Sequence, residues 1–153
     1  MQRVLFVGTE NAARSQMAEG MLRAWAGDRY DVASAGTAFT HVSPEAISVM
    51  AELGIDITGH HSKSVDEFLG QQWQWVITVC ETARHTCPAF PGAAQTDHWS
   101  LEDPSSIGGT DAERLDAFRR VREKIAGRVR QFVLVADRPY TQATTPVIDL
   151  PSR

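Results

Sequence analysis

The sequence has few cysteines, no long apolar run and no excess of basic residues. Its 153 residues include only two cysteines, too few for a secreted disulfide scaffold. The formal net charge of -4 is opposite in sign to a nucleic-acid-binding surface, so we expect no nucleic-acid partner. No apolar run approaches the roughly 18 residues that span a bilayer, and we therefore expect a cytoplasmic protein with no membrane partner.

The alternation of apolar runs and amphipathic segments indicates the fold class. Strands are predicted at residues 4–7, 30–35, 75–79 and 95–99, and helices at 15–26, 44–53, 65–69 and 111–132. Ser43 and Pro44 form a helix start, and Thr110 with Glu113 forms a capping box. This order predicts an α/β fold with an open four-stranded parallel sheet, flanked by helices on both faces, that binds ligands at the carboxyl ends of its strands.

The length and composition predict one domain followed by a tail. A chain of 153 residues with 42% hydrophobic content can bury a single core without disulfides. The helical pattern ends near residue 132, and the last segment contains Pro139, Pro146 and Pro151. We therefore predict a domain at residues 1–132 and an extended or partly disordered tail at 133–153.

A short loop joins the first predicted strand to the first predicted helix. Its backbone N–H groups and the helix N-terminus can converge on one small anion, and the Arg14 guanidinium can clamp that anion in a bidentate manner. An ordinary strand-to-helix connection with a solvent-facing arginine would show the same spacing. The candidate oxyanion-binding residues after Gly8 are Thr9, Glu10, Asn11, Ala12, Ala13, Arg14 and Ser15.

A resemblance favours the anion-binding interpretation. Residues 4–20 read V-L-F-V-G-T-E-N-A-A-R-S-Q-M-A-E-G, and this string resembles the signature of low-molecular-weight tyrosine phosphatases and their arsenate-reductase relatives. In those families position 8 is a cysteine whose thiolate attacks phosphorus or arsenic. Here position 8 is glycine, which has no nucleophile. We predict that this chain holds an oxyanion such as arsenate, phosphate or sulfate but does not transform it.

The two cysteines, Cys80 and Cys87, flank a polar segment that follows the third predicted strand. From the residues alone they could be packed thiols, a redox pair or metal ligands, although Cys80, Cys87 and His85 lack a standard zinc spacing. We expect no metal and no cofactor. The stretch T-V-C-E-T-A-R-H-T-C-P, with His98-Trp99 and Asp103-Pro104 after it, resembles thioredoxin-coupled arsenate reductases.

That resemblance extends from residue 3 to about residue 132 and implies a relay of three cysteines. The loop cysteine forms a thiol-arsenate adduct, Cys80 attacks it to release arsenite, and Cys87 captures the resulting disulfide. Thioredoxin then supplies the reducing equivalents. The resemblance also implies that the 80–87 segment moves, and that Cys80 and Cys87 can still pair with each other in the present chain.

Asp103 is the candidate general acid. An Asp-Pro pair in a polar loop can simply form a turn or a helix N-cap, but in the phosphatase family the aspartate at this place protonates the leaving oxygen. Tyrosine phosphatases carry aromatic residues just after it, whereas Ser105 and Ser106 follow here. The substrate is therefore expected to be small and inorganic.

Four residues are predicted to support the loop: Asn11, Glu19, Ser34 and Lys63. Some arsenate reductases hold a monovalent cation behind the loop with residues that correspond to the first three and an acid. Lys63 stands at the fourth position here, so its ammonium could replace the cation and pair with Glu19, unless it is a solvated surface lysine. We assign no role to His60 or His61.

The leading hypothesis is an arsenate reductase of the thioredoxin-dependent class in a nucleophile-less form. A low-molecular-weight protein tyrosine phosphatase would account for the loop and Asp103, but not for the cysteine pair. A non-catalytic oxyanion-binding protein would have Gly8 as its working residue. Returning a thiol to position 8 and assaying arsenate against aryl phosphate would separate the first two.

Overall fold

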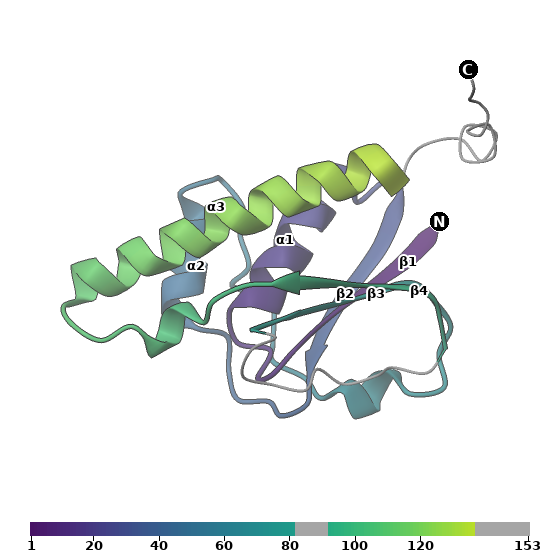
Figure 1. The fold of residues 1–153 in the computed structure, drawn as a ribbon, viewed down its shortest axis with the longest axis horizontal. Coiled ribbons are helices and arrows are strands. Elements are labelled where there is room, and N and C mark those ends of the chain that lie inside the picture. The colour runs from purple at the N-terminus through teal and green to yellow at the C-terminus, as the bar shows by residue number, and fades with distance from the viewer. Residues whose placement is uncertain (82–91, 137–153) are drawn as a thin grey trace, which may run out of the picture.

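The computed structural model describes residues 1–81 and 92–136, and these form one parallel sheet with helices packed on it (Figure 1). The sheet has four strands in the order β2-β1-β3-β4, and every neighbouring pair is parallel. The predicted fold class is confirmed. The strands are β1 (Gln2–Gly8), β2 (Tyr30–Gly36), β3 (Trp73–Cys80) and β4 (Ala93–Ser100).

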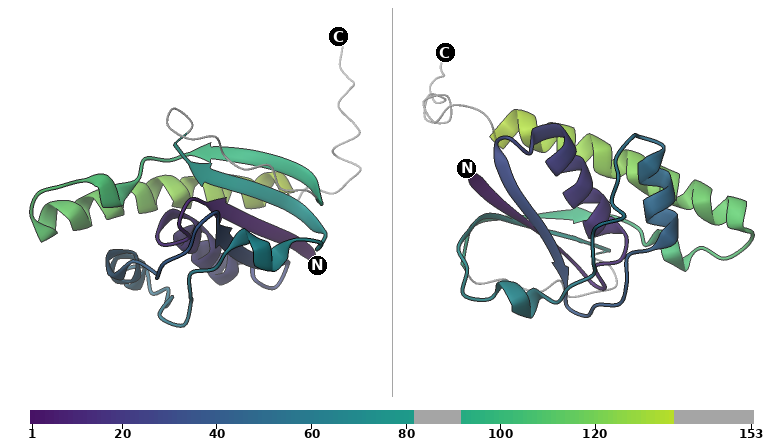
Figure 2. Two further views of the ribbon diagram at one scale, coloured as in Figure 1. Left: turned by 90° about the horizontal axis from the view of Figure 1, so that it is seen from below. Right: turned by 180° about the vertical axis from the view of Figure 1, so that it is seen from behind.

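Three α-helices pack together on one face of the sheet (Figures 1 and 2). On the opposite face, within the described ranges, the short η1 supplies the apolar cover through Val65 and Phe68. The predicted helical cover of this second face is therefore small among the described residues, because the segment predicted as a helix near Val65 forms only one 3-10 turn. The helices are α1 (Arg14–Ala26), α2 (Pro44–Ala51), α3 (Asp111–Ala136), η1 (Val65–Phe68) and η2 (Pro104–Ser106).

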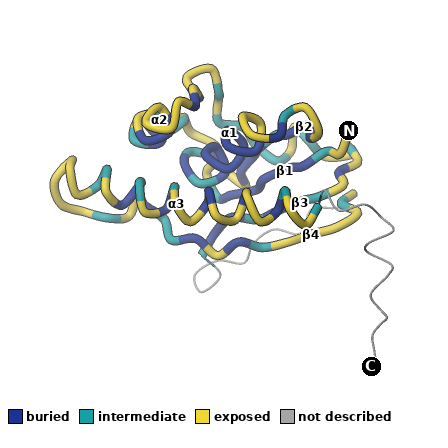
Figure 3. The backbone as a smooth tube through the Cα atoms, turned by 90° about the horizontal axis from the view of Figure 1, so that it is seen from above, coloured by how far each residue is buried: buried dark blue, intermediate teal, exposed yellow. Residues whose placement is uncertain are grey.

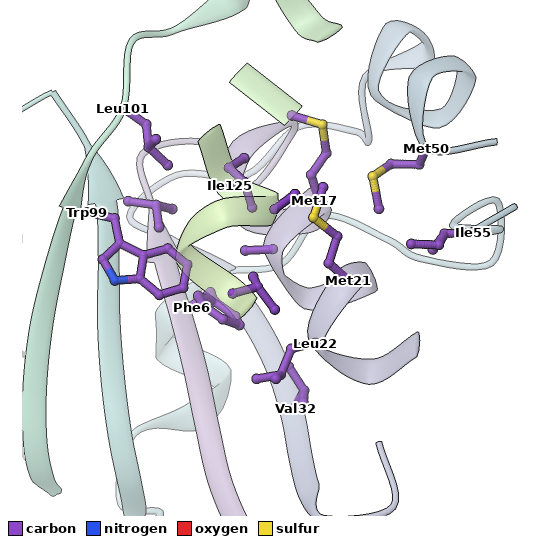
Figure 4. Packing of buried hydrophobic residues seen from close by; sticks show 14 of the residues in the cluster. Phe6, Met17, Met21, Leu22, Val32, Met50, Ile55, Trp99, Leu101 and Ile125 are labelled. Atoms are coloured by element: carbon purple, nitrogen blue, oxygen red, sulfur yellow. The ribbon is translucent and has the colours of Figure 1, made fainter. Parts of the chain in front are cut away.

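The larger core lies between the sheet and these three helices (Figure 4). The rings of Phe6 on β1 and Trp99 on β4 pack in a tilted arrangement with their centroids 5.4 Å apart. Ile125 of α3 belongs to the same core cluster. Along α1, the apolar residues that recur at helical spacing are buried, except that Trp25 is 40% exposed. Figure 3 shows β1 buried along most of its length and α3 exposed on its outer side.

The caps that were read from the sequence form as hydrogen bonds. The Ser43 hydroxyl accepts from the Ala46 amide at the start of α2, at 3.4 Å. At the start of α3, Thr110 and Glu113 exchange the two bonds of a capping box, at 2.8 and 3.1 Å. Both predicted helix starts are therefore confirmed.

The end of α3 differs from the prediction. The helix continues through residues 133–136, where Val133 and Ala136 pack against the core, so this part of the predicted tail is helical. Residues 137–153 lie outside the described residues, and so does Cys87. No helix in the described ranges has the length and apolar character needed to cross a membrane.

Candidate oxyanion site

The loop between β1 and α1 lines a small pocket at the carboxyl edge of the sheet. The pocket volume is about 160 Å³, below the roughly 300 Å³ at which drug-sized sites begin. Val79, Asp103 and Ser105 line it from other segments. The remaining lining residues are those of the predicted loop, Gly8, Thr9, Glu10, Asn11, Ala12, Ala13, Arg14 and Ser15. The pocket is of a size for a small inorganic ion.

The peptide groups of the loop are oriented for an anion. Every carbonyl from residue 8 to residue 13 accepts a hydrogen bond from a group outside the loop, while no N–H of residues 9–13 donates one within the described part of the chain. The carbonyl and the N–H of a trans peptide point in opposite directions, so these amides face the pocket. The donors to the carbonyls are, in order, Thr37 N, Ala38 N, Ser62 Oγ, Gln16 Nε2, Ser43 N and Met17 N.

Asn11 holds the loop from inside. It is 2% exposed, and its φ of 54° is the left-handed conformation that asparagine tolerates better than most residues. Its side-chain amide donates to the hydroxyls of Ser15 and Ser34, at 2.8 and 2.9 Å. Its side-chain oxygen accepts from Gln16 Nε2 at 2.8 Å and from the Lys63 amide at 2.9 Å. All the hydrogen-bonding groups of its side chain are therefore used to hold the loop.

A second layer of polar side chains lies behind Asn11. The Ser34 hydroxyl donates to Glu19 Oε1 at 2.5 Å, and Arg23 pairs with Glu19 Oε2 at 2.6 Å. Lys63 Nζ lies 4.0 Å from Glu19 Oε1. The four predicted support residues, Asn11, Glu19, Ser34 and Lys63, thus come together.

The cationic groups around Glu19 are partly withdrawn from water. Burial lowers the pKa of Lys63, and the charge of Glu19 partly offsets that effect. Burial also lowers the pKa of His60, again opposed by Glu19 and reinforced by Arg23 and Lys63. His60 is therefore held toward its neutral form beside a carboxylate that already has two cationic partners.

Gly8 is not a position where only glycine fits. Its φ is not in the left-handed range, and a Cβ built on it would lie 3.2 Å from Ser15 Oγ and 3.7 Å from a methyl group of Val79. Ser15 Oγ already accepts from Asn11, so its own proton remains available for a neighbour at position 8. A side chain placed at position 8 would point toward the pocket and need only a small shift of the serine hydroxyl.

Arg14 and Asp103 both line the pocket. One terminal nitrogen of Arg14 donates to the Leu101 carbonyl at 2.9 Å, which anchors the guanidinium beside the loop. Asp103 Oδ1 accepts from the Ser105 amide at 2.9 Å and caps η2. Asp103 therefore caps η2 and also lines the pocket.

Cys80 ends β3, the strand next to β1. It is 3% exposed and follows Val79, which lines the pocket. Successive side chains of a strand point to opposite faces, so Cys80 lies behind the pocket wall rather than in it. Its place beside the loop edge is compatible with the relay, whereas its predicted partner Cys87 is outside the described residues.

Two members of this site were not found by sequence reasoning. Gln16 is fully buried and donates to Asn11 and to the His61 carbonyl, while His60 Nδ1 lies 2.9 Å from Gln16 Oε1. The signal available for Gln16 was its own position, as a polar residue directly before the buried apolar residues of α1. His60 gave none, because its role depends on residues 44 and 41 positions earlier in the chain.

Comparison with known proteins agrees with this geometry. Residues 3–142 match the low molecular weight phosphotyrosine protein phosphatase family, and the chain belongs to that family. It is 42% identical to an arsenate reductase of Halalkalibacterium halodurans over 129 residues, which cover 84% of this chain and 93% of that protein.

Solved structures show the same likeness. One described as an arsenate reductase in the phosphate binding state has a TM-score of 0.76 and 33% identity, covering 88% of this chain and 98% of its own. A thioredoxin-dependent arsenate reductase of Corynebacterium glutamicum has a TM-score of 0.69 and 25% identity, covering 90% of this chain and 62% of its own. The fold and the family are thus those that the loop signature predicted.

Proposed function

We propose that this chain is an arsenate reductase scaffold that binds a tetrahedral oxyanion and, with glycine at position 8, does not reduce it. The observation that carries the proposal is the ring of inward-facing amides from residues 9–13 beside Arg14. Such amides stabilise a small anion without any side-chain charge, and Arg14 adds a bidentate clamp. The arsenate reductases among its relatives support arsenate as the ion.

The reaction that the scaffold would support starts with a thiolate at position 8. That thiolate displaces an oxygen of arsenate, and we assign Asp103 as the acid that protonates the leaving oxygen. Cys80 then attacks the sulfur at position 8, the electrons of the sulfur–arsenic bond stay with arsenic, and arsenite leaves. Cys87 attacks Cys80, which releases residue 8 as a thiol and leaves an 80–87 disulfide. A thioredoxin dithiol reduces that disulfide.

The relative from Corynebacterium glutamicum supports thioredoxin as the partner. In the present chain the first bond cannot form, because Gly8 offers no nucleophile. The expected product of binding is therefore a stable complex with arsenate, phosphate or sulfate. The cytoplasmic location, the absence of a cofactor and the roles of Cys80 and Cys87 remain predictions from the sequence.

The Gly8→Cys substitution tests the proposal. Because the tightest contact of a Cβ at this position is the movable Ser15 hydroxyl at 3.2 Å, we expect the variant to fold and to reduce arsenate with thioredoxin, thioredoxin reductase and NADPH. The matched control is Gly8→Ser, which adds nearly the same atoms without a thiolate and should stay inactive. NADPH consumption and the arsenite formed are measured together.

Three outcomes would contradict parts of the proposal. Aryl phosphate hydrolysis by Gly8→Cys without arsenate reduction would favour a tyrosine phosphatase. Single-turnover arsenate reduction by the unaltered chain would show that Gly8 does not abolish the chemistry. Failure of the unaltered chain to bind phosphate, measured by calorimetry, would remove the anion site itself.

A further inference from the structure

A groove follows the last turns of α3, where this helix passes the edge strand β4. Its floor is aromatic, because Phe132 of α3 packs edge-to-face on Trp75 of β3 with the ring centroids 5.2 Å apart, and Trp99 of β4 lines the same groove. The groove has a volume of about 190 Å³ and is open to solvent at Val135, which is 53% exposed. It shares no lining residue with the oxyanion pocket.

An arginine without a partner also lines this groove. Arg128 makes no hydrogen bond and no ion pair with any residue in the described part of the chain. The acid in the groove lining, Asp97, is already used, since its carboxylate oxygens accept from the His98 amide and the Trp99 indole, at 2.8 and 3.3 Å. An apolar segment that carries a single carboxylate would therefore fit the groove in both polarity and charge.

The chain contains a segment of that kind beyond the end of α3. Residues 137–153 include two acids, and the second, Asp149, stands between Ile148 and Leu150 in the sequence V-I-D-L. Residues 141–146 read T-Q-A-T-T-P and have no large apolar side chain. The apolar side chains near the end of the sequence are thus gathered around that one carboxylate.

This segment is tethered at the groove itself, because Ala136, the last residue of α3, is part of the groove lining. Arg128 lies eight residues before Ala136, which is about 12 Å along the helix axis. Asp149 follows Ala136 by thirteen residues, a length whose root-mean-square span as a coil is roughly 20 Å. The tether gives the segment an effective concentration in the millimolar range, which a second copy of the chain in dilute solution does not reach.

We propose that residues 147–150 dock in this groove and that the Asp149 carboxylate pairs with the Arg128 guanidinium. In an extended segment Ile148 and Leu150 point to one side, toward the aromatic floor, and Asp149 points to the other, toward the rim where Arg128 is exposed. Docking removes apolar surface from water and supplies the missing partner of the arginine. The inference is independent of the proposed function, since no residue of the oxyanion pocket takes part.

A charge exchange in the full chain tests this pairing. Hydrogen exchange of the backbone amides of residues 129–136, measured by mass spectrometry, reports how firmly the last turns of α3 are held. We expect Arg128→Asp and Asp149→Arg each to raise the exchange rate roughly threefold, as the loss of an exposed ion pair would, and the double variant to restore the parent rate. Ile148→Ser combined with Leu150→Ser removes the apolar contact and should raise the rate by about tenfold.

The matched control is Arg120→Asp, at an exposed arginine of the same helix outside the groove, and adding Asp149→Arg should not change its effect. Additive effects of Arg128→Asp and Asp149→Arg in the double variant would overturn the pairing, and a rate unchanged by the serine substitutions would overturn the docking. Protection that grows with protein concentration, together with dimers in sedimentation, would assign the groove to a second copy and also overturn the proposal. Because no oxyanion is present in these measurements, a failure of Gly8→Cys to reduce arsenate would leave their result standing.

Discussion

At the scale of single residues, the side chain of Asn11 holds the conformation of the loop between β1 and α1. It occupies a left-handed backbone conformation and uses its side-chain amide to tie the loop to Ser15, Ser34 and Lys63. Removing the amide would leave buried groups such as Gln16 Nε2 with fewer acceptors, and each unpaired buried group costs free energy.

We therefore predict that Asn11→Ala lowers the free energy of unfolding by about 3 kcal/mol and weakens phosphate binding. Urea unfolding and calorimetry measure the two effects. The matched control is Asn11→Asp, which keeps an acceptor for the Lys63 amide but loses both donors and adds a negative charge near the anion. It should lose less stability than the alanine variant while binding phosphate poorly. Equal stability of Asn11→Ala and the parent would show that the bonds do not hold the loop.

The loop residues were identified in the sequence through the family resemblance, because the spacing of strand, arginine and helix start alone also fits an ordinary connection. Asp103 was placed by family resemblance, and the structure adds that it caps η2 as well as lining the pocket. Gln16 and His60 were not predictable. Their roles are set by partners on other segments, which the local pattern does not identify.

At the scale of elements, the carboxylate of Glu52 joins α2 to α3. Glu52, the C-cap residue of α2, pairs with Arg119 at 2.8 Å and with Arg122 at 2.6 Å on α3. These hydrogen bonds lower the pKa of Glu52 to about 2. A lowered carboxyl pKa contributes stability above the unfolded-state value, and this contribution is lost as the pH falls from about 4.5 toward about 2.

Glu52→Gln should therefore lower the urea midpoint modestly at pH 7, and the difference from the parent should shrink as the pH approaches 2. Because the pair is exposed, added salt should also reduce the difference. Urea unfolding between pH 2 and pH 7 measures the effect. Asp28→Asn, at an exposed acid outside this pair, serves as the control. A difference that stays constant across the pH range would contradict the assignment.

The element boundaries show where pattern reasoning stops. The four strands and the starts of α2 and α3 follow from apolar runs and capping residues, which are local properties. The end of α3 was misjudged, because Val133 and Ala136 continue the helical spacing of Val129 and Phe132 and pack against the same core. Placing all three α-helices on one face likewise depends on how the chain crosses the sheet.

At the scale of the whole molecule, one polar network ties the loop, α1, β2 and the 60–63 segment together. Glu19 is its centre, with Ser34, Arg23, Lys63 and His60 around it. The Lys63 ammonium stands 4.0 Å from the Glu19 carboxylate, where it can supply the positive charge that a bound cation would otherwise bring.

We predict that potassium and sodium chloride give the same Tm for this protein, since the site already contains its own cation. Lys63→Asp should create a demand for an external cation, so that potassium raises the Tm of this variant above its value in sodium. Lys124→Asp, on the exposed pair with Glu102, is the matched control and should show no preference between the salts. A potassium effect on the parent would indicate that Lys63 does not fill the charge position.

The sequence by itself determined the strands, the helix starts and the absence of a nucleophile at position 8, because each of these depends on residues adjacent in the chain, and it indicated the oxyanion loop through the family resemblance. Only the tertiary structure decided that the loop carbonyls turn outward, that Glu19 gathers Arg23, Lys63 and His60, and that His98 Nε2 is buried without a hydrogen-bond partner among the described residues. Those features arise where segments distant in sequence meet, and the register of strands and the packing of helices fix which groups are paired.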